Sequence, residues 1–185
     1  MLDRHGERFE WVELWNEPNN LLDWDGRLDP DWLIFCRMIG GAVYWAKRRG
    51  KKTVLAGTSP TDLGWLGLMH ERGVLAHIDA VGVHGFPDTW DCHWPGWPDI
   101  LAGVRRVLAE RGLSPQVWIT EAGHSAWRRD EMRQLRRFLD LLEAPADRVY
   151  WYAVQDLDPE LESQEGFHLD ERHYHMGGLR PDGSP

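Results

Sequence analysis

Two apolar segments about a hundred residues apart each end in a glutamate, and this feature limits the fold most. The first is Trp11–Asn19, which carries Glu17, and the second is Val117–Gly123, which carries Glu121. Each segment has strand character and delivers its carboxyl group where the strand stops, which is where parallel α/β sheets and barrels present their chemistry. Pro18 cannot continue a strand ladder, so it ends the first strand. Glu17 and Glu121 are therefore the candidate catalytic pair.

The rest of the sequence alternates between strand and helix patterns. Strands are expected over residues 10–15, 53–57, 78–84, 116–120 and 148–154, and helices over residues 30–49, 61–72, 99–111 and 128–143. Asp29 is the expected N-cap of the first long helix and Pro30 its first residue. This alternation implies parallel βαβ units in one α/β domain over residues 1–185, either a doubly wound sheet or a barrel. No glycine-rich phosphate loop follows the first strand, which argues against a nucleotide-binding sheet.

Composition excludes several classes of function. The net charge is −9 and the lysines and arginines are scattered, so nothing indicates a nucleic-acid-binding surface. No apolar run approaches the length that spans a membrane, and the N-terminal residues are too polar for a secretory signal. The sequence as written therefore favours a soluble protein of the cytoplasm. Cys36 and Cys92 provide no disulfide framework.

Tryptophan is unusually frequent, with 12 residues. Indole rings stack on the apolar faces of sugars, although packing is the commoner role of any single tryptophan. The tryptophans that fall at strand ends or in loops, where a cleft would form, are Trp15, Trp24, Trp90, Trp94, Trp97 and Trp127. Their clustering favours a carbohydrate ligand.

Paired carboxyl groups suit the cleavage of a glycosidic bond. One group must give a proton to the leaving oxygen while the other supplies electron density to the anomeric carbon, so one is protonated and the other ionised at the same pH. Glu17 is expected to hold the proton, because the charge of Glu121 disfavours a second one nearby. The alternative is that a glutamate before a proline is an ordinary solvated turn residue. Two such sites in register with repeating strand–helix units favour the functional interpretation.

These motifs resemble those of the clan of retaining glycoside hydrolases built on a (β/α)8 barrel, with catalytic glutamates on the fourth and seventh strands. Residues 15–19 resemble the acid/base motif and residues 118–121 the nucleophile motif, while residues 81–86 and 150–156 resemble the ends of the sixth and eighth strands. The nearest branch is the β-xylosidase and iduronidase-like group, or a cellulase-like neighbour. The resemblance implies a partial TIM barrel of about strands four to eight, with the first three strand–helix units absent.

The resemblance also implies a mechanism and a set of site residues. Glu17 would protonate the departing oxygen and later activate water, and Glu121 would attack the anomeric carbon. The residues expected to bind substrate are Asn16, Trp15, His84, Trp24 and either Trp151 or Tyr152. No cofactor or metal ion is implied, and the spacing of His168, His173 and His175 matches no zinc pattern. The usual second-strand arginine has no counterpart, and Phe86 stands where the clan often has tyrosine.

A partial barrel leaves alternatives open. The chain could be a non-catalytic carbohydrate-binding remnant, or a half-barrel that needs a partner chain. Its two open sheet edges predict self-association. Five strand residues are expected to be partly exposed on the uncovered inner face: Val12, Leu14, Val117, Ile119 and Val149.

Overall fold

The centre of the fold is a five-stranded parallel sheet. We describe residues 2–160 and 170–184 of a computed structural model. The strands are β1 (Trp11–Leu14), β2 (Lys52–Leu55), β3 (Ala80–Gly85), β4 (Gln116–Ala122) and β5 (Arg148–Trp151). They lie in chain order, each parallel to the next. All five carboxyl ends therefore meet along one edge, as the alternation of strands and helices predicted.

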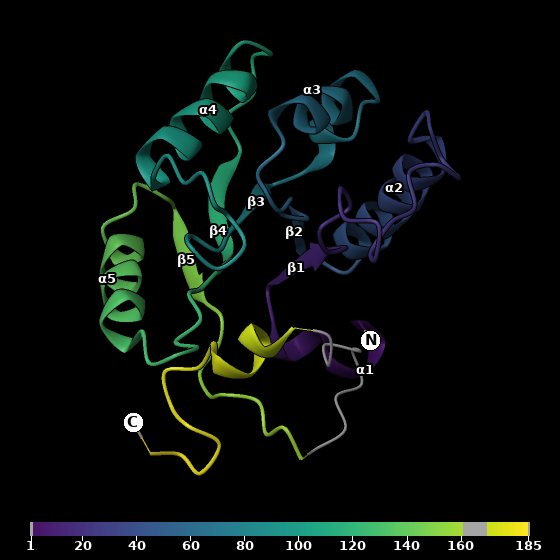
Figure 1. The fold of residues 1–185 in the computed structure, drawn as a ribbon. Coiled ribbons are helices and arrows are strands. Elements are labelled where there is room, and N and C mark those ends of the chain that lie inside the picture. The colour runs from purple at the N-terminus through teal and green to yellow at the C-terminus, as the bar shows by residue number, and fades with distance from the viewer. Residues whose placement is uncertain (1, 161–169, 185) are drawn as a thin grey trace.

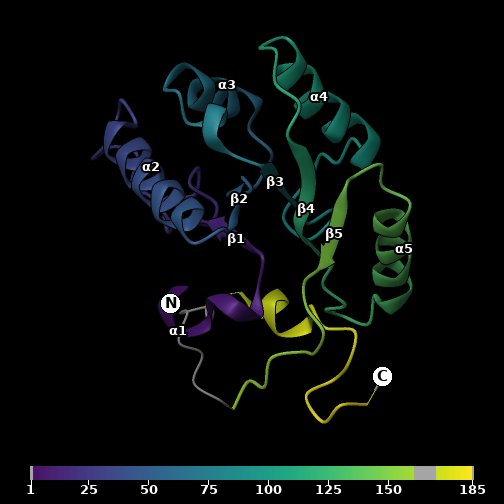
Figure 2. The same cartoon turned by 180° about the vertical axis from the view of Figure 1, so that it is seen from behind.

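Four long helices alternate with the strands and cover one face of the sheet. They are α2 (Leu33–Arg48), α3 (Leu63–Glu71), α4 (Trp97–Ala109) and α5 (Glu131–Leu142). Figures 1 and 2 show these helices in an arc outside the curved sheet, while the concave face has no matching layer. The short elements are α1 (Leu2–His5) and the 3-10 helices η1 (Gly6–Arg8), η2 (Leu75–His77) and η4 (Glu171–His175). This arrangement is a partial (β/α) barrel.

The first long helix begins later than expected. We placed its start at Pro30, but Trp32 has a left-handed backbone with φ 58°, so the helix starts at Leu33. Asp29 still caps the start of the helix, because its carboxylate accepts hydrogen bonds from the amides of Ile34 at 3.1 Å and Phe35 at 2.9 Å. These bonds satisfy two of the amides that a helix start leaves without partners.

The alternation of side chains along each strand divides the sheet into two unlike faces. Leu14, Val117 and Ile119 point toward the helices and are buried in the main core, with 7%, 1% and 0% of their surface exposed. Val12 and Val149 pack against the same core. The expectation of partial exposure on the inner face is therefore wrong for Leu14, Val117 and Ile119, which are buried. Val12 and Val149 are partly exposed as expected, but on the side of the helix-covered core. The reason is the period of two in a strand: the apolar positions face the helices, and the residues between them face the open side.

The inner face carries aromatic and polar side chains instead. Trp11 of β1 and Trp118 of β4 pack ring to ring with centroids 4.4 Å apart, and the Arg148 guanidinium lies 4.5 Å from the Trp118 ring. Trp118 is thereby buried although no helix layer covers this side. A tryptophan pair capped by a cation thus shields the floor of the open half-barrel.

Two of the smaller expectations are also resolved. Cys36 and Cys92 are both free thiols. Within residues 2–160 and 170–184, no helix combines the length and the apolar character that crossing a membrane requires.

Self-association is the expected behaviour of this sheet in solution. β1 and β5 are the edge strands, so each leaves one row of backbone donors and acceptors without a neighbouring strand. We expect the chain to form dimers or larger species as its concentration rises at physiological salt. Sedimentation velocity over a hundredfold concentration range measures this directly. A single monomeric species throughout would show that the edges are protected.

Candidate active site

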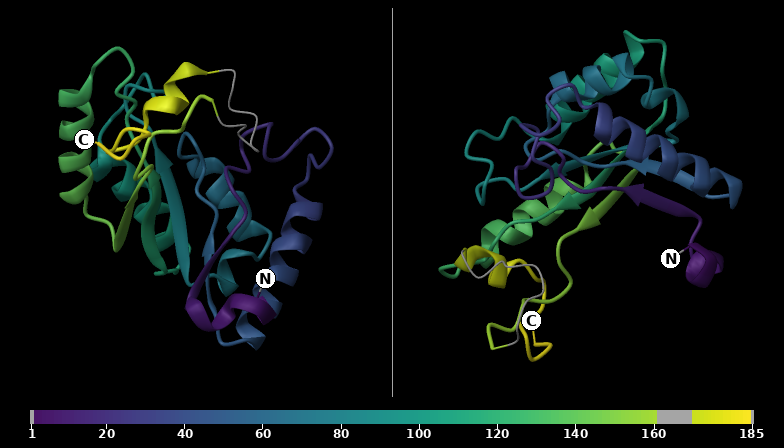
Figure 3. Two further views of the ribbon diagram at one scale, coloured as in Figure 1. Left: turned by 90° about the horizontal axis from the view of Figure 1, so that it is seen from below. Right: turned by 90° about the vertical axis from the view of Figure 1, so that its right-hand side faces the viewer.

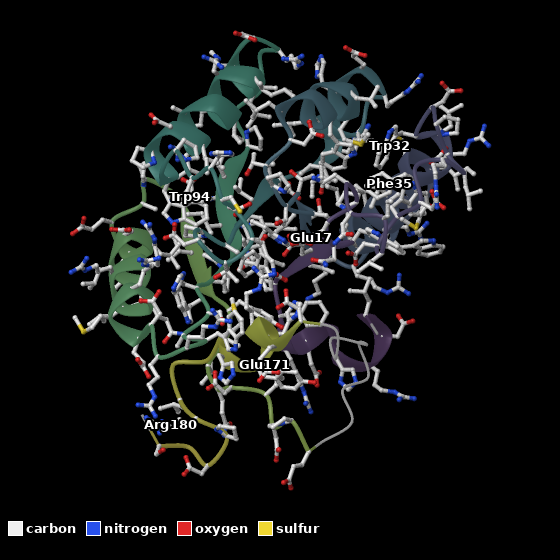
Figure 4. The ribbon with its side chains drawn as sticks, viewed as in Figure 1. Glu17, Trp32, Phe35, Trp94, Glu171 and Arg180 are labelled. Carbon is white, nitrogen blue, oxygen red and sulfur yellow. The ribbon has the colours of Figure 1, made fainter. Side chains whose placement is uncertain are left out.

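The candidate catalytic residues meet where the strands end. Glu17 follows β1, His84 lies in β3 and Glu121 lies in β4, and Figure 4 shows Glu17 near the centre of the molecule. His84 Nδ1 lies 2.9 Å from Glu17 Oε1 and 3.8 Å from Glu121 Oε2. One carboxylate oxygen of Glu17 and one of Glu121 lie within 4.8 Å of each other. The structure therefore brings together three residues that the sequence singled out separately.

A bulge in β4 explains how two consecutive residues both reach His84. Val83 pairs with Ile119, but His84 pairs with Glu121, so Thr120 is an extra residue in the ladder. Regular alternation would send Thr120 and Glu121 to opposite faces. The extra residue turns the strand end, which is a known use of bulges near active sites.

Two residues of this site were missed at the sequence level. The Thr120 hydroxyl donates a hydrogen bond of 2.9 Å to Glu13 Oε1, and Thr120 Oγ1 lies 3.1 Å from His84 Nε2. Glu13 Oε1 also accepts the backbone amide of Gly57 at 3.3 Å. Glu13 is on the inner face of β1, where the open half-barrel leaves it exposed. A charged residue between Val12 and Leu14, in an otherwise apolar strand, was the available signal.

The loop after β1 holds three predicted substrate-binding residues, two of which share Asp23 as a hydrogen-bond partner. Asp23 accepts hydrogen bonds from Trp15 Nε1 through its backbone carbonyl at 3.1 Å and from the Asn16 amide through its carboxylate at 3.3 Å. Trp24 packs edge-on against Trp15, with centroids 5.7 Å apart. Trp15 is 44% exposed and so presents ring surface on the loop that carries Glu17, whereas Trp24 is half-buried against the core.

The backbone of this loop is unusual for its residue types. Trp15 has φ 77° and Glu17 has φ 32°, both in the left-handed region that favours glycine. Asn19 fixes the loop to its neighbour, since its side chain donates to the carbonyls of Ser59 and Pro60 at 3.2 and 3.1 Å. Backbone strain of this kind is typical of functional loops that the surrounding structure holds in place.

The end of β5 separates the two candidates for the eighth-strand aromatic residue. Trp151 packs edge-on against Phe138 of α5, with centroids 5.3 Å apart, and so lies on the helix-covered face away from the site. Tyr152 lies beside Phe86, with centroids 6.1 Å apart, at the end where His84 and Glu121 lie. The geometry therefore argues against Trp151 as a sugar-binding residue and retains Tyr152.

The C-terminal segment is attached to the loop after β3. Asp170 Oδ2 accepts a hydrogen bond from Trp90 Nε1 at 2.9 Å and pairs with Arg172 at 2.7 Å. The His173 ring lies on the Trp90 ring, with centroids 4.6 Å apart. Figure 3 shows η4 at the end of the sheet where the strands finish. His168 lies outside the described residues.

The loop tryptophans have different degrees of exposure. Trp97 begins α4 and is buried, with only 3% of its surface exposed, so its expected place in a cleft is wrong. Trp94 packs edge-on against Trp97 at 4.8 Å. Trp127 is 36% exposed and lies under the Arg128 guanidinium at 4.1 Å. Among the expected cleft tryptophans, Trp15, on the loop that carries Glu17, is therefore the most exposed.

The pKa of Glu121 differs from the expectation that this carboxyl is ionised at neutral pH. Burial raises the pKa of Glu121 to about 7; nearby His84 opposes this shift and the charge of Glu17 adds to it. Burial lowers the pKa of His84, but the hydrogen bond to Glu17 and the charges of Glu121, Glu17 and Glu13 outweigh it, and the net pKa is raised. Glu121 in this chain thus retains a proton to higher pH than an ordinary glutamate does. We had expected the neighbouring carboxyl, Glu17, to be the protonated one.

Glu17, His84 and Glu121 also provide ligand atoms of the kind that bind a divalent metal ion. An imidazole nitrogen and two carboxylate oxygens lie within 4.8 Å of one another. An ion placed there would have to displace the direct hydrogen bond between His84 and Glu17, which is only 2.9 Å long. We therefore treat the group as one that handles protons rather than as a metal centre.

The fold is similar to parts of the (β/α) barrels of several solved glycoside hydrolases. A family 39 glycoside hydrolase from the gut symbiont Bacteroides cellulosilyticus WH2 superimposes with a TM-score of 0.65 at 18% identity, over 100% of this chain and 40% of that one. A family 2 β-galacturonidase from Eisenbergiella tayi, bound to galacturonate, gives 0.69 at 15% identity, over 100% of this chain and 33% of that one.

A third solved structure is similar over a smaller part of the chain. A family 128 endo-β-1,3-glucanase from Amycolatopsis mediterranei, in complex with laminarihexaose, gives a TM-score of 0.54 at 12% identity, over 83% of this chain and 66% of that one. At these identities the likeness shows a shared fold. The chain spans 40% and 33% of the first two structures, so it matches only part of each barrel. No protein-family model matches the chain, and no curated protein matches it.

The raised pKa of Glu121 makes a stability prediction. A carboxyl whose folded pKa lies above its unfolded value favours the folded state only while protonated, so stability falls as pH rises from about 4.5 to about 7. Glu121→Gln removes this loss. We expect the variant to be more stable than the parent at pH 8 by on the order of 1 kcal/mol, about 2–4 °C in midpoint, allowing for partial exposure, and equal to it at pH 4.

Thermal denaturation at the two pH values measures the difference. Glu71→Gln, at the exposed end of α3, is the matched control. Its difference in stability from the parent should be the same at pH 4 and pH 8. Equal stability of Glu121→Gln and the parent at pH 8 would contradict the shift.

Proposed function

We propose that this chain carries the catalytic half of a retaining glycoside hydrolase. Glu17 is the acid/base group, which protonates the leaving oxygen and later removes a proton from water. Glu121 is the nucleophile that attacks the anomeric carbon and forms the glycosyl-enzyme intermediate. The observation that carries the proposal is that oxygens of Glu17 and Glu121 lie within 4.8 Å of each other, both close to Nδ1 of His84.

This separation supports double displacement rather than inversion. Retaining enzymes place their carboxyl groups about 5–5.5 Å apart, whereas inverting enzymes leave about 6.5–9.5 Å so that a water molecule fits between the sugar and the base. Both glutamates are partly accessible, with 15% of the Glu17 side chain and 32% of the Glu121 side chain exposed. A substrate can therefore reach both groups from the open side.

The proposed reaction requires Glu121 to be ionised. At a pKa of about 7 roughly half of the Glu121 side chains are protonated at neutral pH, and a protonated carboxyl is a poor nucleophile. A positive charge near Glu121 would lower this pKa. We therefore assign full activity to the chain together with the first three strand–helix units of the barrel, whether these belong to the same polypeptide or to another one.

The raised pKa of Glu121 also favours a second candidate function, which is carbohydrate binding without turnover. A site that holds one proton among neighbouring carboxyl groups can still donate and accept hydrogen bonds to sugar hydroxyls. Trp15 supplies an exposed ring on the loop that carries Glu17. In that case sugar affinity would fall on Trp15→Ala and would not depend on the charge of Glu121.

Covalent labelling separates the two functions. An activated 2-fluoro glycoside traps the glycosyl-enzyme intermediate of a retaining enzyme, because the second step is slowed. We expect mass spectrometry of the proteolysed protein to locate the adduct on Glu121, in the chain alone or completed by the missing units. Glu121→Ala should abolish the adduct.

The acid/base assignment has its own kinetic test. Glu17→Ala should slow substrates with poor leaving groups by about 10²–10⁴-fold and change activated aryl glycosides much less, since these need little protonation. Glu110→Ala, at the end of α4 and remote from the site, is the control and should change neither. Absence of an adduct with pentoside and hexoside probes, in both the isolated and the completed protein, would leave carbohydrate binding as the function.

A further inference from the structure

The His84 ring is held on both sides by hydrogen bonds of different kinds. Its Nε2 lies 3.1 Å from Thr120 Oγ1, and its Nδ1 lies 2.9 Å from Glu17 Oε1. Thr120 in turn donates its hydroxyl proton to Glu13 Oε1 at 2.9 Å. Four residues from β1, the loop after it, β3 and β4 thus form one continuous chain of hydrogen bonds, Glu13–Thr120–His84–Glu17.

The direction of this chain follows from the number of protons available. A hydroxyl has one proton, and the Thr120 hydroxyl gives it to Glu13, so toward His84 its oxygen can only accept. His84 Nε2 must therefore carry a proton and donate it to Thr120. The tautomer of the neutral ring is thereby determined, with the proton on Nε2 and a lone pair on Nδ1.

The lone pair on Nδ1 has a consequence for Glu17. At 2.9 Å, an unprotonated Nδ1 and an ionised carboxylate would present two lone pairs to each other, which is repulsive. One proton must lie between them, either on Nδ1 beside an ionised Glu17 or on Glu17 beside a neutral ring. The pair therefore holds the single proton that an acid/base group needs for its first step.

We propose that Glu13 and Thr120 are positioning residues, which orient the His84 ring protons so that His84 Nδ1 and Glu17 share one transferable proton. In the acid step this proton passes to the leaving oxygen, leaving Glu17 ionised and His84 neutral. In the second step water supplies the replacement proton, and the pair returns to its starting state. The role of this shared proton in catalysis rests on the proposed function, whereas the tautomer of His84 does not.

Two glycines support the proposal because they make room for the hydrogen-bond chain. A Cβ added at Gly57 would lie 2.2 Å from Cδ2 and 2.6 Å from Nε2 of His84, and one added at Gly82 would lie 2.7 Å from Glu13 Oε1. Gly57 and Gly82 thus lie so close to the hydrogen-bonded residues His84 and Glu13 that neither position has room for a side chain. Since Glu13 is exposed in the open half-barrel, the geometry of these contacts carries the proposal rather than burial.

Several charged groups surround His84 and influence its protonation. Glu17, Glu121 and Glu13 face it from the loop after β1, from β4 and from β1, and each of their charges raises its pKa. Behind them, the charge of Asp23 acts on Glu121, and Asp91 and His173 interact electrostatically with Glu17. A titration of His84 therefore has to be read as that of a coupled cluster.

Nitrogen NMR of the ¹⁵N-histidine-labelled chain tests the tautomer without any substrate. The sequence has 9 histidines, and His84→Gln assigns the ring by the signal that disappears. In the parent we expect protonated Nε2 at every pH at which the chain is folded. Thr120→Val removes the acceptor of Nε2–H and should shift the neutral ring about fivefold toward the Nδ1–H tautomer, whereas Thr120→Ser retains the hydroxyl and the parent tautomer.

A second pair of variants tests Glu13. Glu13→Met removes the acceptor of the Thr120 hydroxyl, so this hydroxyl can donate to Nε2 and the ring should change tautomer in the same direction. Glu13→Gln retains an acceptor oxygen, so the parent tautomer should persist while the loss of a nearby negative charge lowers the pKa of His84. If Glu13→Met does not fold, the Thr120 pair still decides the question.

The outcomes are distinct from those of the labelling experiment. A neutral parent ring with its proton on Nδ1, or equal tautomer ratios in Thr120→Val and Thr120→Ser, would overturn the proposal even if Glu121 is labelled. An Nε2–H parent that responds to Thr120→Val supports it even if no adduct forms, in which case only the proposed function fails. In an active protein, Thr120→Val should slow poor leaving groups more than activated ones and shift the alkaline limb of the pH profile.

Discussion

A single imidazole ring lies close to both candidate catalytic carboxyl groups, at the edge of the sheet where the strands end. His84 is 1% exposed, and its two ring nitrogens are bonded to Glu17 and Thr120. Without it, Glu17 and Glu121 would be like charges within 4.8 Å of each other in a partly desolvated site, which is unfavourable. The bulge at Thr120, the left-handed backbone at Glu17 and the two glycines all serve to bring partners to this ring.

The residues that could be predicted are those that depend on period and position alone. The strands at Trp11 and Val117 and the placement of Glu17 and Glu121 at their ends follow from apolar runs that stop, and parallel pairing then brings the ends together. The long helices follow from the spacing of their apolar residues. Their observed ends differ from the predicted ends by a few residues, because capping depends on the local backbone conformation, such as that of Trp32.

The residues that could not be predicted depend on contacts between strands. Thr120 reaches His84 because of a one-residue shift in register, and no property of Thr120 itself reports that shift. Glu13 was overlooked because its partners lie 44 and 107 residues away, at Gly57 and Thr120. The sequence left Trp151 and Tyr152 as alternatives for the site, and only the alternation of β5 directs Trp151 toward Phe138.

The site residues all come from the five strands and loops of the half-barrel. In a closed barrel, the opposite half would also contribute to their surroundings. Glu13, His84 and Glu121 come from β1, β3 and β4. In a closed barrel the side chains opposite them would come from strands other than the five that the structure describes. The raised pKa of Glu121 is consistent with this division: the carboxyl groups are present, but no guanidinium faces Glu121 to lower its pKa in the part of the chain that the structure describes.

The absence of a side chain at Gly57 and Gly82 is informative about other residues. Each glycine leaves a space that His84 or Glu13 fills, and a Cβ at either position would occupy the same volume as one of those groups. The identity of these two positions is therefore coupled to chemistry elsewhere in the sheet. In an alignment of related half-barrels, an alanine in either column would mark a branch that has lost this arrangement, even if both catalytic glutamates were still in place.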